Sequence, residues 1–337
     1  MFFRILSRRI NLLITIIFFG GLSQQVNGED IIQGEPCTLQ QAAELSIIEN
    51  STNALLVSVS VNNAPAIFMI DTGAFWSIIK PRLTIGLPSY RAGYQLVAAS
   101  GGKLDHYTII PSLQLERFLL KNKEFFVGAE STQDDDQLAG MLGSDLLSHF
   151  DIEIDPSRSK VTLFGQRHCR GQVVYWPQTD AVRIPFKFNK NWINIPVLLD
   201  GKPLRAIIDT GATDSLLDAD FAEQELNLIP NEDEELSSSI TADGKNIQIY
   251  RHQFETLQIG ALKFSNPVIA IENRKGKSQK PKRLTSNSWG LLIGMRQLKM
   301  LHLYIAYSEE ALYVSTVKGD EAARNDVNPA HAGAHPE

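Results

Sequence analysis

The chain has 337 residues, a length that allows two domains. Its 43% apolar and 21% charged residues are typical of a globular protein, and its two cysteines are too few for a four-cysteine zinc site or a disulfide-rich scaffold. The formal charge of −6 argues against a general nucleic-acid-binding protein. These numbers leave a soluble enzyme or binding protein with room for two cores.

Residues 1–28 have the features of a secretory signal peptide. Three arginines before residue 10 precede an apolar run from Ile10 to Leu22, and residues 26–28 offer a cleavage site. The alternative is an uncleaved membrane anchor, for which that run is short. Cleavage would change the charge from −6 to −9, because it removes three arginines and no acidic residue.

Export would place Cys37 and Cys169 in an oxidising compartment, where two cysteines can form one disulfide. Such a bond would enclose residues 38–168, a segment the size of a small domain. The alternative is a pair of unrelated buried thiols. Of the two, we expect the disulfide.

Two segments of the chain repeat each other at an offset of 138 residues. Residues 57–79 and 195–217 align without a gap and share the sequence Asp-Thr-Gly-Ala, at 71–74 and at 209–212. In each copy an alternating strand, a turn and a more apolar strand lead into this motif. An apolar-apolar-Gly step then recurs at 141–143 and 292–294. A repeat of this kind is not plausibly accidental.

The copies predict two mostly β lobes, at residues 51–166 and 182–316, joined by a linker at 167–181. Residues 29–50 form an N-terminal segment, and Glu29–Ser51 could act as a short pro-segment. The polar, Ala-rich tail at 317–337 is predicted to be disordered.

This doubled motif resembles the retropepsin-like aspartic proteases, in the bacterial exported form with both lobes on one chain. The resemblance extends over nearly the whole mature protein and includes residues 37–39, 140–145 and 168–176. It implies a pseudo-twofold pair of β-barrel lobes that together form one active site. It also implies export, with the periplasm as the expected compartment, a peptide or protein substrate, and activity as a monomer.

The resemblance implies that Asp71 and Asp209 form the catalytic dyad of an aspartic endopeptidase. Two carboxyls about 3 Å apart cannot both ionise, so the pair holds one proton. The ionised member would take a proton from a bridging water, and the protonated member would hydrogen-bond the scissile carbonyl. The water attacks, and the dyad protonates the leaving amine. This chemistry uses neither a cofactor nor a metal, and we expect none.

The residues after each aspartate would support the active-site loops. In the family the threonines hydrogen-bond across the pseudo-twofold axis, and the glycines let the two backbones approach. The alanines stand where pepsin-like enzymes often have Ser or Thr, whose hydroxyl helps to keep the pKa of the aspartate low. We therefore predict a less acidic pH optimum than in the pepsin group. The supporting residues are Thr72, Gly73, Ala74, Thr210, Gly211 and Ala212.

The middle hairpin of each copy is predicted to act as a flap that closes over an extended peptide. The alternative is a pair of ordinary surface hairpins. The candidate flap residues are Ser100, Gly101, Gly102, Asp243 and Gly244.

Two features of the sequence depart from the doubled pattern. Asp214 takes the place of Trp76, where it either points inward and perturbs the dyad or is a solvated residue at a strand end. The second Gly step also lacks the acidic residue that the first copy has in Asp145.

A further group of carboxylates lies in the first copy. Its members alternate with isoleucines, which favours the solvated face of a strand over a metal cluster. The residues are Asp151, Glu153 and Asp155.

The main alternative function is a non-catalytic protein that binds peptides in the same groove; the presence of both aspartates favours the enzyme.

A basic run in the second copy is most simply a solvated loop. The sharper hypothesis is that it docks on an anionic surface or selects one end of an asymmetric substrate. The run consists of Arg274, Lys275, Lys277, Lys280, Lys282 and Arg283.

Overall fold

The computed structural model describes residues 38–97, 103–128, 137–176, 181–189, 191–228, 236–240, 246–272, 290–317 and 327–329. Several predicted features lie outside these ranges. They are the signal peptide, Cys37, the basic run at 274–283, and the flap candidates Ser100, Gly101, Gly102, Asp243 and Gly244.

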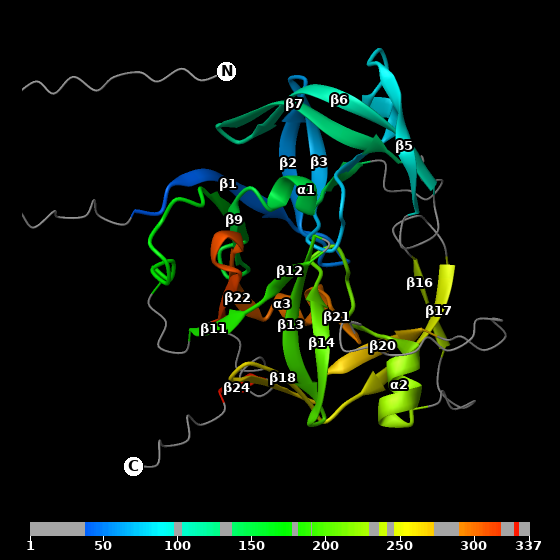
Figure 1. The fold of residues 1–337 in the computed structure, drawn as a ribbon, viewed down its shortest axis with the longest axis vertical. Helices are drawn as coiled ribbons and strands as arrows, with labels where there is room; N and C mark the ends of the chain where they lie inside the picture. Colours follow the sequence, from blue (N-terminus) through cyan, green and yellow to red (C-terminus); the bar gives the residue numbers. More distant parts are fainter. Residues whose placement is uncertain are drawn as a thin grey trace, which may run out of the picture. The chain divides into compact units, whose positions relative to one another are not determined.

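The first half of the chain is built almost wholly from strands (Figure 1). A short helix, α1 (Ser144–Leu147), and the 3-10 turn η1 (Pro81–Leu83) interrupt them. The strands are β1 (Gln41–Ile48), β2 (Leu56–Val61), β3 (Ala64–Ile70), β4 (Ile78–Ile79), β5 (Ser89–Val97), β6 (Lys103–Leu115), β7 (Phe118–Val127), β8 (Leu138–Leu142), β9 (Asp151–Asp155) and β10 (Lys160–Phe164).

The second half repeats this plan, with α2 (Ala219–Leu226), α3 (Met295–Leu298) and the 3-10 turn η2 (Tyr307–Glu309). Its strands are β11 (Val182–Pro185), β12 (Lys187–Asn189), β13 (Trp192–Leu199), β14 (Lys202–Ile208), β15 (Leu216–Leu217), β16 (Leu236–Ile240), β17 (Asn246–Gln253), β18 (Thr256–Ile259), β19 (Leu262–Ser265), β20 (Val268–Glu272), β21 (Leu291–Ile293), β22 (Leu301–Ala306) and β23 (Ala311–Thr316). One more strand, β24 (Val327–Pro329), comes from the tail and pairs with β19.

The repeat in the sequence is also a repeat in strand pairing. The strands β2 and β3 form an antiparallel hairpin, β8 runs parallel to β3, and β4 pairs with the other edge of β8. In the second half β13, β14, β21 and β15 pair in the same way. The mostly β, two-lobed fold predicted from the sequence is confirmed.

Local sequence explains the hairpin that opens each copy. Val57, Val59 and Val61 are buried on one face of β2, and the alternating serines are less buried. The turns that follow have positive φ angles at both central residues, 50° and 68° at Asn62-Asn63 and 47° and 76° at Asp200-Gly201. Asn, Asp and Gly tolerate this conformation, and its twist matches that of paired strands.

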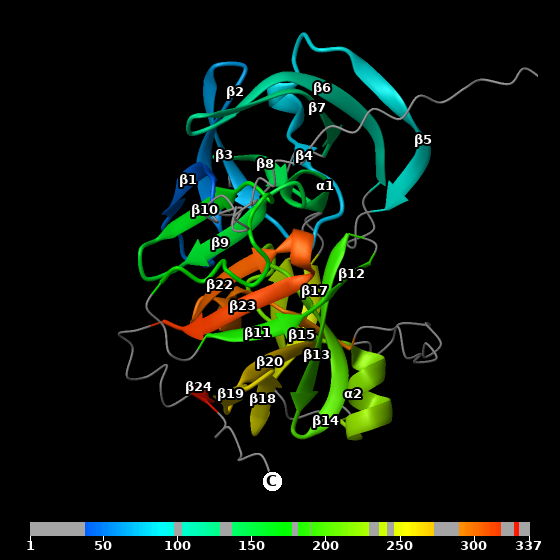
Figure 2. The same cartoon turned by 60° about the vertical axis from the view of Figure 1, so that its left-hand side comes forward.

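A sheet shared by both halves joins the two lobes. Its strands run in the order β11-β23-β22-β9-β10-β1, and Figure 2 shows β9, β22, β23 and β11 side by side. At the junction β22 pairs antiparallel with β9, with Tyr304 opposite Glu153. The strand β1 belongs to the N-terminal segment at residues 29–50, and it pairs antiparallel with β10.

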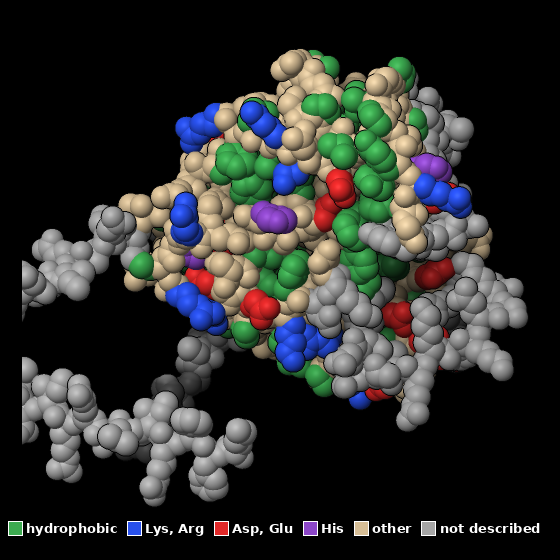
Figure 3. Space-filling view, turned by 45° about the horizontal axis from the view of Figure 1, so that its top comes forward, with side chains coloured by type: hydrophobic (Ala, Val, Ile, Leu, Met, Phe, Trp, Pro, Cys, Tyr) green, Lys and Arg blue, Asp and Glu red, His purple; other side chains and the backbone are tan. Residues whose placement is uncertain are grey.

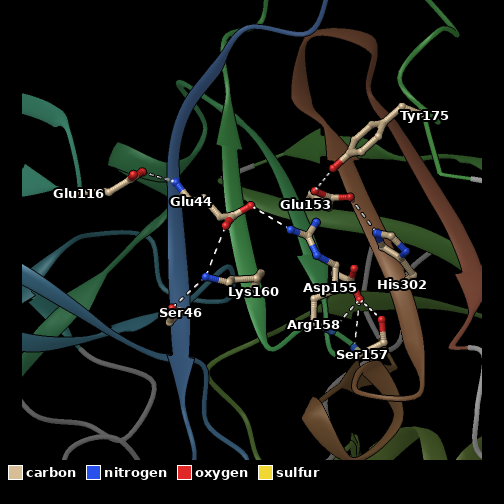
Figure 4. Close-up of polar contacts among 10 residues, drawn as sticks. All are labelled: Glu44, Ser46, Glu116, Glu153, Asp155, Ser157, Arg158, Lys160, Tyr175 and His302. Carbon is tan, nitrogen blue, oxygen red and sulfur yellow. Dashed lines mark hydrogen bonds and ion pairs between the residues drawn. The ribbon is translucent and has the colours of Figure 1, made fainter.

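The prediction that Asp151, Glu153 and Asp155 form a solvated face is wrong. Their exposed fractions are 0%, 1% and 5%, because β9 is an interior strand of the shared sheet and the linker covers its polar side. Figure 4 shows Glu153 between Tyr175 from the linker, at 2.5 Å, and His302 from β22, at 2.8 Å.

The linker is held to this sheet by further contacts. His168 Nε2 lies 2.5 Å from an Asp151 oxygen, and the Trp176 ring stacks on His302 with centroids 4.1 Å apart. Cys169 is disulfide-bonded in the structure. Because its expected partner Cys37 lies outside the described residues, the pairing of the two stays a prediction.

Two further observations concern the surface and the membrane. On the face shown in Figure 3, Lys and Arg side chains are spread over the surface and hydrophobic side chains form the larger groups. Among the residues that the structure describes, no helix has the length and apolar character needed to cross a membrane.

Candidate active site

The two Asp-Thr-Gly loops emerge from equivalent places in the two lobes. Asp71 directly follows β3, and its backbone N–H donates to the Leu142 carbonyl at 3.0 Å. Asp209 directly follows β14, and its N–H donates to the Ile293 carbonyl, also at 3.0 Å. In both lobes the aspartate is therefore fixed at the end of a buried pair of parallel strands.

The threonines lock the two loops together. Thr72 Oγ1 donates to the Ile208 carbonyl at 2.9 Å and accepts the Thr210 N–H at 3.1 Å. Thr210 Oγ1 donates to the Ile70 carbonyl at 2.7 Å and accepts the Thr72 N–H at 3.1 Å. Both side chains are fully buried. Each hydroxyl thus satisfies a carbonyl and an N–H of the opposite lobe.

The glycines allow the close approach that this lock requires. A Cβ atom on Gly73 would lie 2.2 Å from Cγ of Asp209, and one on Gly211 would lie 2.3 Å from Cγ of Asp71. Each aspartate therefore occupies the space that a side chain of the opposite loop would fill. No other residue fits at either position without moving the carboxyls apart.

The carboxyls of Asp71 and Asp209 are hydrogen-bonded to each other. Asp71 Oδ1 also accepts the N–H groups of Gly73, at 2.9 Å, and Ala74, at 2.8 Å, while Asp209 Oδ1 accepts that of Gly211, at 2.9 Å. The side chains that the sequence pattern singled out are thus brought together, one from each copy.

Burial raises the pKa of both carboxyls. For Asp71, the backbone N–H groups of Ala74 and Gly73 oppose the rise because they stabilise the anion. For Asp209, burial and then the negative charge on Asp71 hold the pKa well above its ordinary value. The two carboxyls are therefore coupled, and the proton that they share belongs to the pair.

The sequence and the fold that form this site are similar to those of known proteins. The aspartyl protease family model matches residues 195–295, which contain the second Asp-Thr-Gly loop and the second Gly step. The matched segment lies within the second lobe, and this part of the chain is similar to the aspartyl proteases. Its structure is similar to that of the aspartic proteinase from Irpex lacteus, with a TM-score of 0.50 and 13% identity over 83% of this chain and 99% of that one. At this identity the similarity shows the fold alone. No curated protein matches the sequence.

The Asp-Thr-Gly loops are supported by the Gly step in each lobe. The carbonyls of Ala74 and Ala212 accept N–H groups from Ser144, at 2.9 Å, and Met295, at 2.8 Å. Ser144 and Met295 begin the short helices α1 and α3, and so each Gly step holds the Asp-Thr-Gly loop of its own lobe in place.

A buried serine links each loop to its helix. Ser77 donates to Asp145 at 2.8 Å, and Ser215 donates to Gln297 at 2.6 Å. The second lobe lacks an acidic residue at the position that matches Asp145, which is Arg296. The amide of Gln297 takes over the acceptor role one residue later.

Asp214 does not contact the dyad in any interaction recorded among the described residues. It accepts hydrogen bonds from Arg251, at 2.7 Å, and Arg296, at 2.6 Å. Partial burial would raise its pKa, but the two guanidinium groups together outweigh this and lower it. Asp214 is therefore an ion-paired residue, which is neither of the two alternatives that the sequence left open.

Trp192 is a contact of the active site that no sequence pattern predicted. Its Nε1–H, at the start of β13, donates to the Gly73 carbonyl of the opposite lobe at 2.8 Å, and its ring lies 4.5 Å from that of Phe75. The position that matches it in the first copy is Ala54, which has no side-chain donor. The two positions lie three residues before the aligned segments, so extending the alignment would have shown an aromatic residue in one copy and an alanine in the other.

No arrangement suited to a metal is found in the described ranges, where no group of three or more His, Cys, Asp or Glu side chains is placed to hold one. The geometry of the dyad supports the chemistry of two carboxyls that share a proton.

Proposed function

We propose that this protein is an aspartic endopeptidase that hydrolyses peptide bonds of extended polypeptides through Asp71 and Asp209. The observation that carries the proposal is the hydrogen-bonded pair of carboxyls, one from each lobe, of which Asp71 is buried and Asp209 half-buried. A pair that shares one proton supplies a base and an acid in the same place.

The two carboxyls have matching environments. Asp71 accepts backbone N–H groups from Gly73 and Ala74, and Asp209 accepts them from Gly211 and Ala212, so the ionised form of either one is supported. The ionised member would take a proton from a water held by the pair, and the protonated member would hydrogen-bond the carbonyl of the scissile bond. After the water attacks, the member that took the proton passes it to the leaving amine.

The alanines support the proposal of a less acidic pH optimum than in pepsin-like enzymes. Ala74 and Ala212 offer the carboxyls only backbone N–H groups, since neither has a hydroxyl side chain. The donors that would lower the pKa values of the dyad are therefore fewer. Activity should peak at a pH where one proton remains on the pair.

Other parts of the proposal rest on the sequence. We propose that the hairpins between β5 and β6 and between β16 and β17 act as flaps, and that the protein is exported to the periplasm and active as a monomer. The flaps would close the groove over a bound peptide, and export would place this activity outside the cytoplasm.

Cleavage of a peptide library by the purified protein tests the function, with an Asp71→Asn variant and a pepstatin-type inhibitor. The enzyme predicts defined cleavage sites that both the substitution and the inhibitor abolish. A binding protein that used the same groove would cut no peptide, and its affinity for peptides would survive the substitution.

A further inference from the structure

The sheet that joins the two lobes carries a cluster of acidic, imidazole and phenol side chains that the proposed mechanism does not use. Three parts of the chain meet in it, which are β9 of the first lobe, the linker, and the segment from β22 through η2 to β23 of the second lobe. We call it the interlobe cluster. Its members are Asp151, Glu153, His168, Tyr175, His302, Tyr304, Glu309 and Tyr313.

His168 of the linker lies between carboxylates from both lobes. Its Nε2 is 2.5 Å from an oxygen of Asp151, and its Nδ1 is 3.2 Å from the Cys169 carbonyl and 3.7 Å from an oxygen of Glu309. The side chains of His168, Asp151 and Glu309 are at most 2% exposed. Each ring nitrogen therefore faces oxygen acceptors, and only the doubly protonated imidazolium can donate from both nitrogens.

A second histidine pairs with the next acidic residue on the same face of β9. His302 Nε2 is 2.8 Å from one oxygen of Glu153, whose other oxygen accepts the Tyr175 hydroxyl at 2.5 Å (Figure 4). The Trp176 ring stacks on His302 with centroids 4.1 Å apart and planes 22° apart. Because an aromatic face attracts a cation, this contact also favours the protonated imidazole.

The linker and the two lobes are tied through the same carboxylates. Glu309 of the second lobe accepts the Gly171 N–H of the linker at 3.0 Å and the Tyr313 hydroxyl at 2.7 Å. Asp151 of the first lobe accepts the backbone N–H of Tyr307, from the second lobe, at 3.0 Å. A change of charge at His168, which contacts both carboxylates, would therefore act on all three parts of the chain.

The interlobe cluster has more acidic than basic groups. Its three carboxylates face two imidazoles, and Asp155, buried at the end of β9, adds a fourth acidic group. No Lys or Arg is buried in the ranges of the chain that the structure describes. Two arginines lie at the edge of the cluster, where Arg183 donates to the Tyr313 hydroxyl at 3.3 Å and Arg158 pairs with Glu44. The histidine protons thus supply the buried positive charge.

The other ionisable groups of the cluster favour their protonated forms. Burial and then the neighbouring carboxylates raise the pKa values of Tyr175, Tyr304 and Tyr313, so these hydroxyls stay neutral. Burial also raises the pKa of Asp151, and the contact with His168 opposes this rise without cancelling it. The stability that Asp151 contributes is thus lost as the pH rises through its folded pKa. Histidine is the residue type whose charge ordinarily changes between pH 5 and 8.

We propose that the interlobe cluster is a pH-sensitive lock, closed while both histidines are protonated and opened as a rising pH removes their protons. Neutral His168 can donate from only one nitrogen, so it loses its contact with either Asp151 or the Cys169 carbonyl. The carboxylates then stay buried without a compensating charge, which is unfavourable. The linker accordingly detaches from the sheet, and the contact between the lobes weakens. This lock does not depend on the proposed function.

Hydrogen exchange of the Gly171 amide tests the lock, because this N–H donates from the linker to Glu309. Its protection factor is corrected for the intrinsic pH dependence of exchange, and in the native protein it should fall at least about tenfold between pH 6 and pH 8.5. One proton lost on opening changes the opening equilibrium about tenfold per pH unit. In His168→Gln the side-chain amide can still donate to Asp151 but does not titrate, so the protection factor should stay constant.

His106→Gln is the matched control. His106 also contacts a carboxylate, that of Asp105 at 2.7 Å, but it lies on β6 and its side chain is 49% exposed. This variant should keep the native pH dependence of Gly171 exchange. A second measurement needs no substitution, since the imidazole NMR signals of His168 and His302 should titrate over the pH range in which Gly171 loses protection.

Three results would overturn the lock. They are a protection factor of Gly171 that does not change with pH in the native protein, one that falls as much in His168→Gln as in His106→Gln, and imidazole signals that titrate outside the range of the change. None of these measurements uses a peptide substrate, so the lock and the endopeptidase stand or fall separately.

Discussion

Replacing Thr72 by valine should weaken the joint between the two lobes. Valine has nearly the shape of threonine but no hydroxyl, so the packing of the buried site is kept. What is lost is a donor to the Ile208 carbonyl and an acceptor for the Thr210 N–H, at 2.9 Å and 3.1 Å. Both of these backbone groups belong to the opposite lobe and lie in the buried centre of the molecule.

The size of the effect follows from the number of groups left without a partner. A buried polar group whose partner is removed costs about 1–3 kcal/mol, so two of them should lower the free energy of unfolding by about 2–6 kcal/mol. Thr72→Val combined with Thr210→Val should cost less than the sum of the single changes, because the two hydroxyls belong to one network.

Denaturant unfolding of the single and double variants provides the measurement, with Thr108→Val as the control. Thr108 is equally buried, but its hydroxyl donates only to the Pro88 carbonyl within the first lobe, at 2.8 Å. Thr72→Ser, which keeps the hydroxyl, should recover most of the loss. The reasoning is refuted if Thr72→Val destabilises the protein no more than Thr108→Val does, or if the Thr72 and Thr210 changes are additive.

Three further outcomes are expected. Trp192→Phe keeps a ring against Phe75 but removes the donor to the Gly73 carbonyl, so kcat should fall by about tenfold with a smaller change in KM; an unchanged kcat would contradict this. Folded Asp209 has a pKa well above 3.8, so its contribution to stability is complete below pH 3.8 and is lost as the pH rises through the folded pKa. Unfolding of Asp209→Asn should therefore depend less on pH, with a gain in stability at pH 7, and a slope equal to that of the native protein would count against it. His302→Ala leaves Glu153 buried with one partner fewer and should cost about 3–5 kcal/mol in thermal or chemical unfolding, whereas His302→Gln should cost much less.

The parts of the fold that the sequence predicted are those that local pattern determines. The two segments that repeat at an offset of 138 residues also form hairpins with equivalent strand pairing. This follows because nearby residues in each copy determine its strands and turns. Turns such as Asp200-Gly201 are set by residue chemistry at two positions. The meeting of the two Asp-Thr-Gly loops could be expected from the resemblance of the doubled motif to a family whose active site is made from two halves.

What the sequence did not predict depends on contacts between distant residues. The alternation along β9 shows that Asp151 and Glu153 share a face, but it does not show that the linker covers that face with His168 and Tyr175. Asp214 is paired with an arginine 82 residues away, which no pattern around it reveals.

The account depends most on the claim that Asp71 and Asp209 act as one unit on a water. The direct measurement is kcat/KM on one cleaved peptide for the native protein, Asp71→Asn and Asp209→Asn. Asp200→Asn, which changes an exposed turn residue, serves as the control. We predict that each dyad variant loses at least about 10²–10⁴-fold in kcat/KM, while the control stays near the native value. Cleavage that survives either dyad substitution at the native rate would contradict the claim.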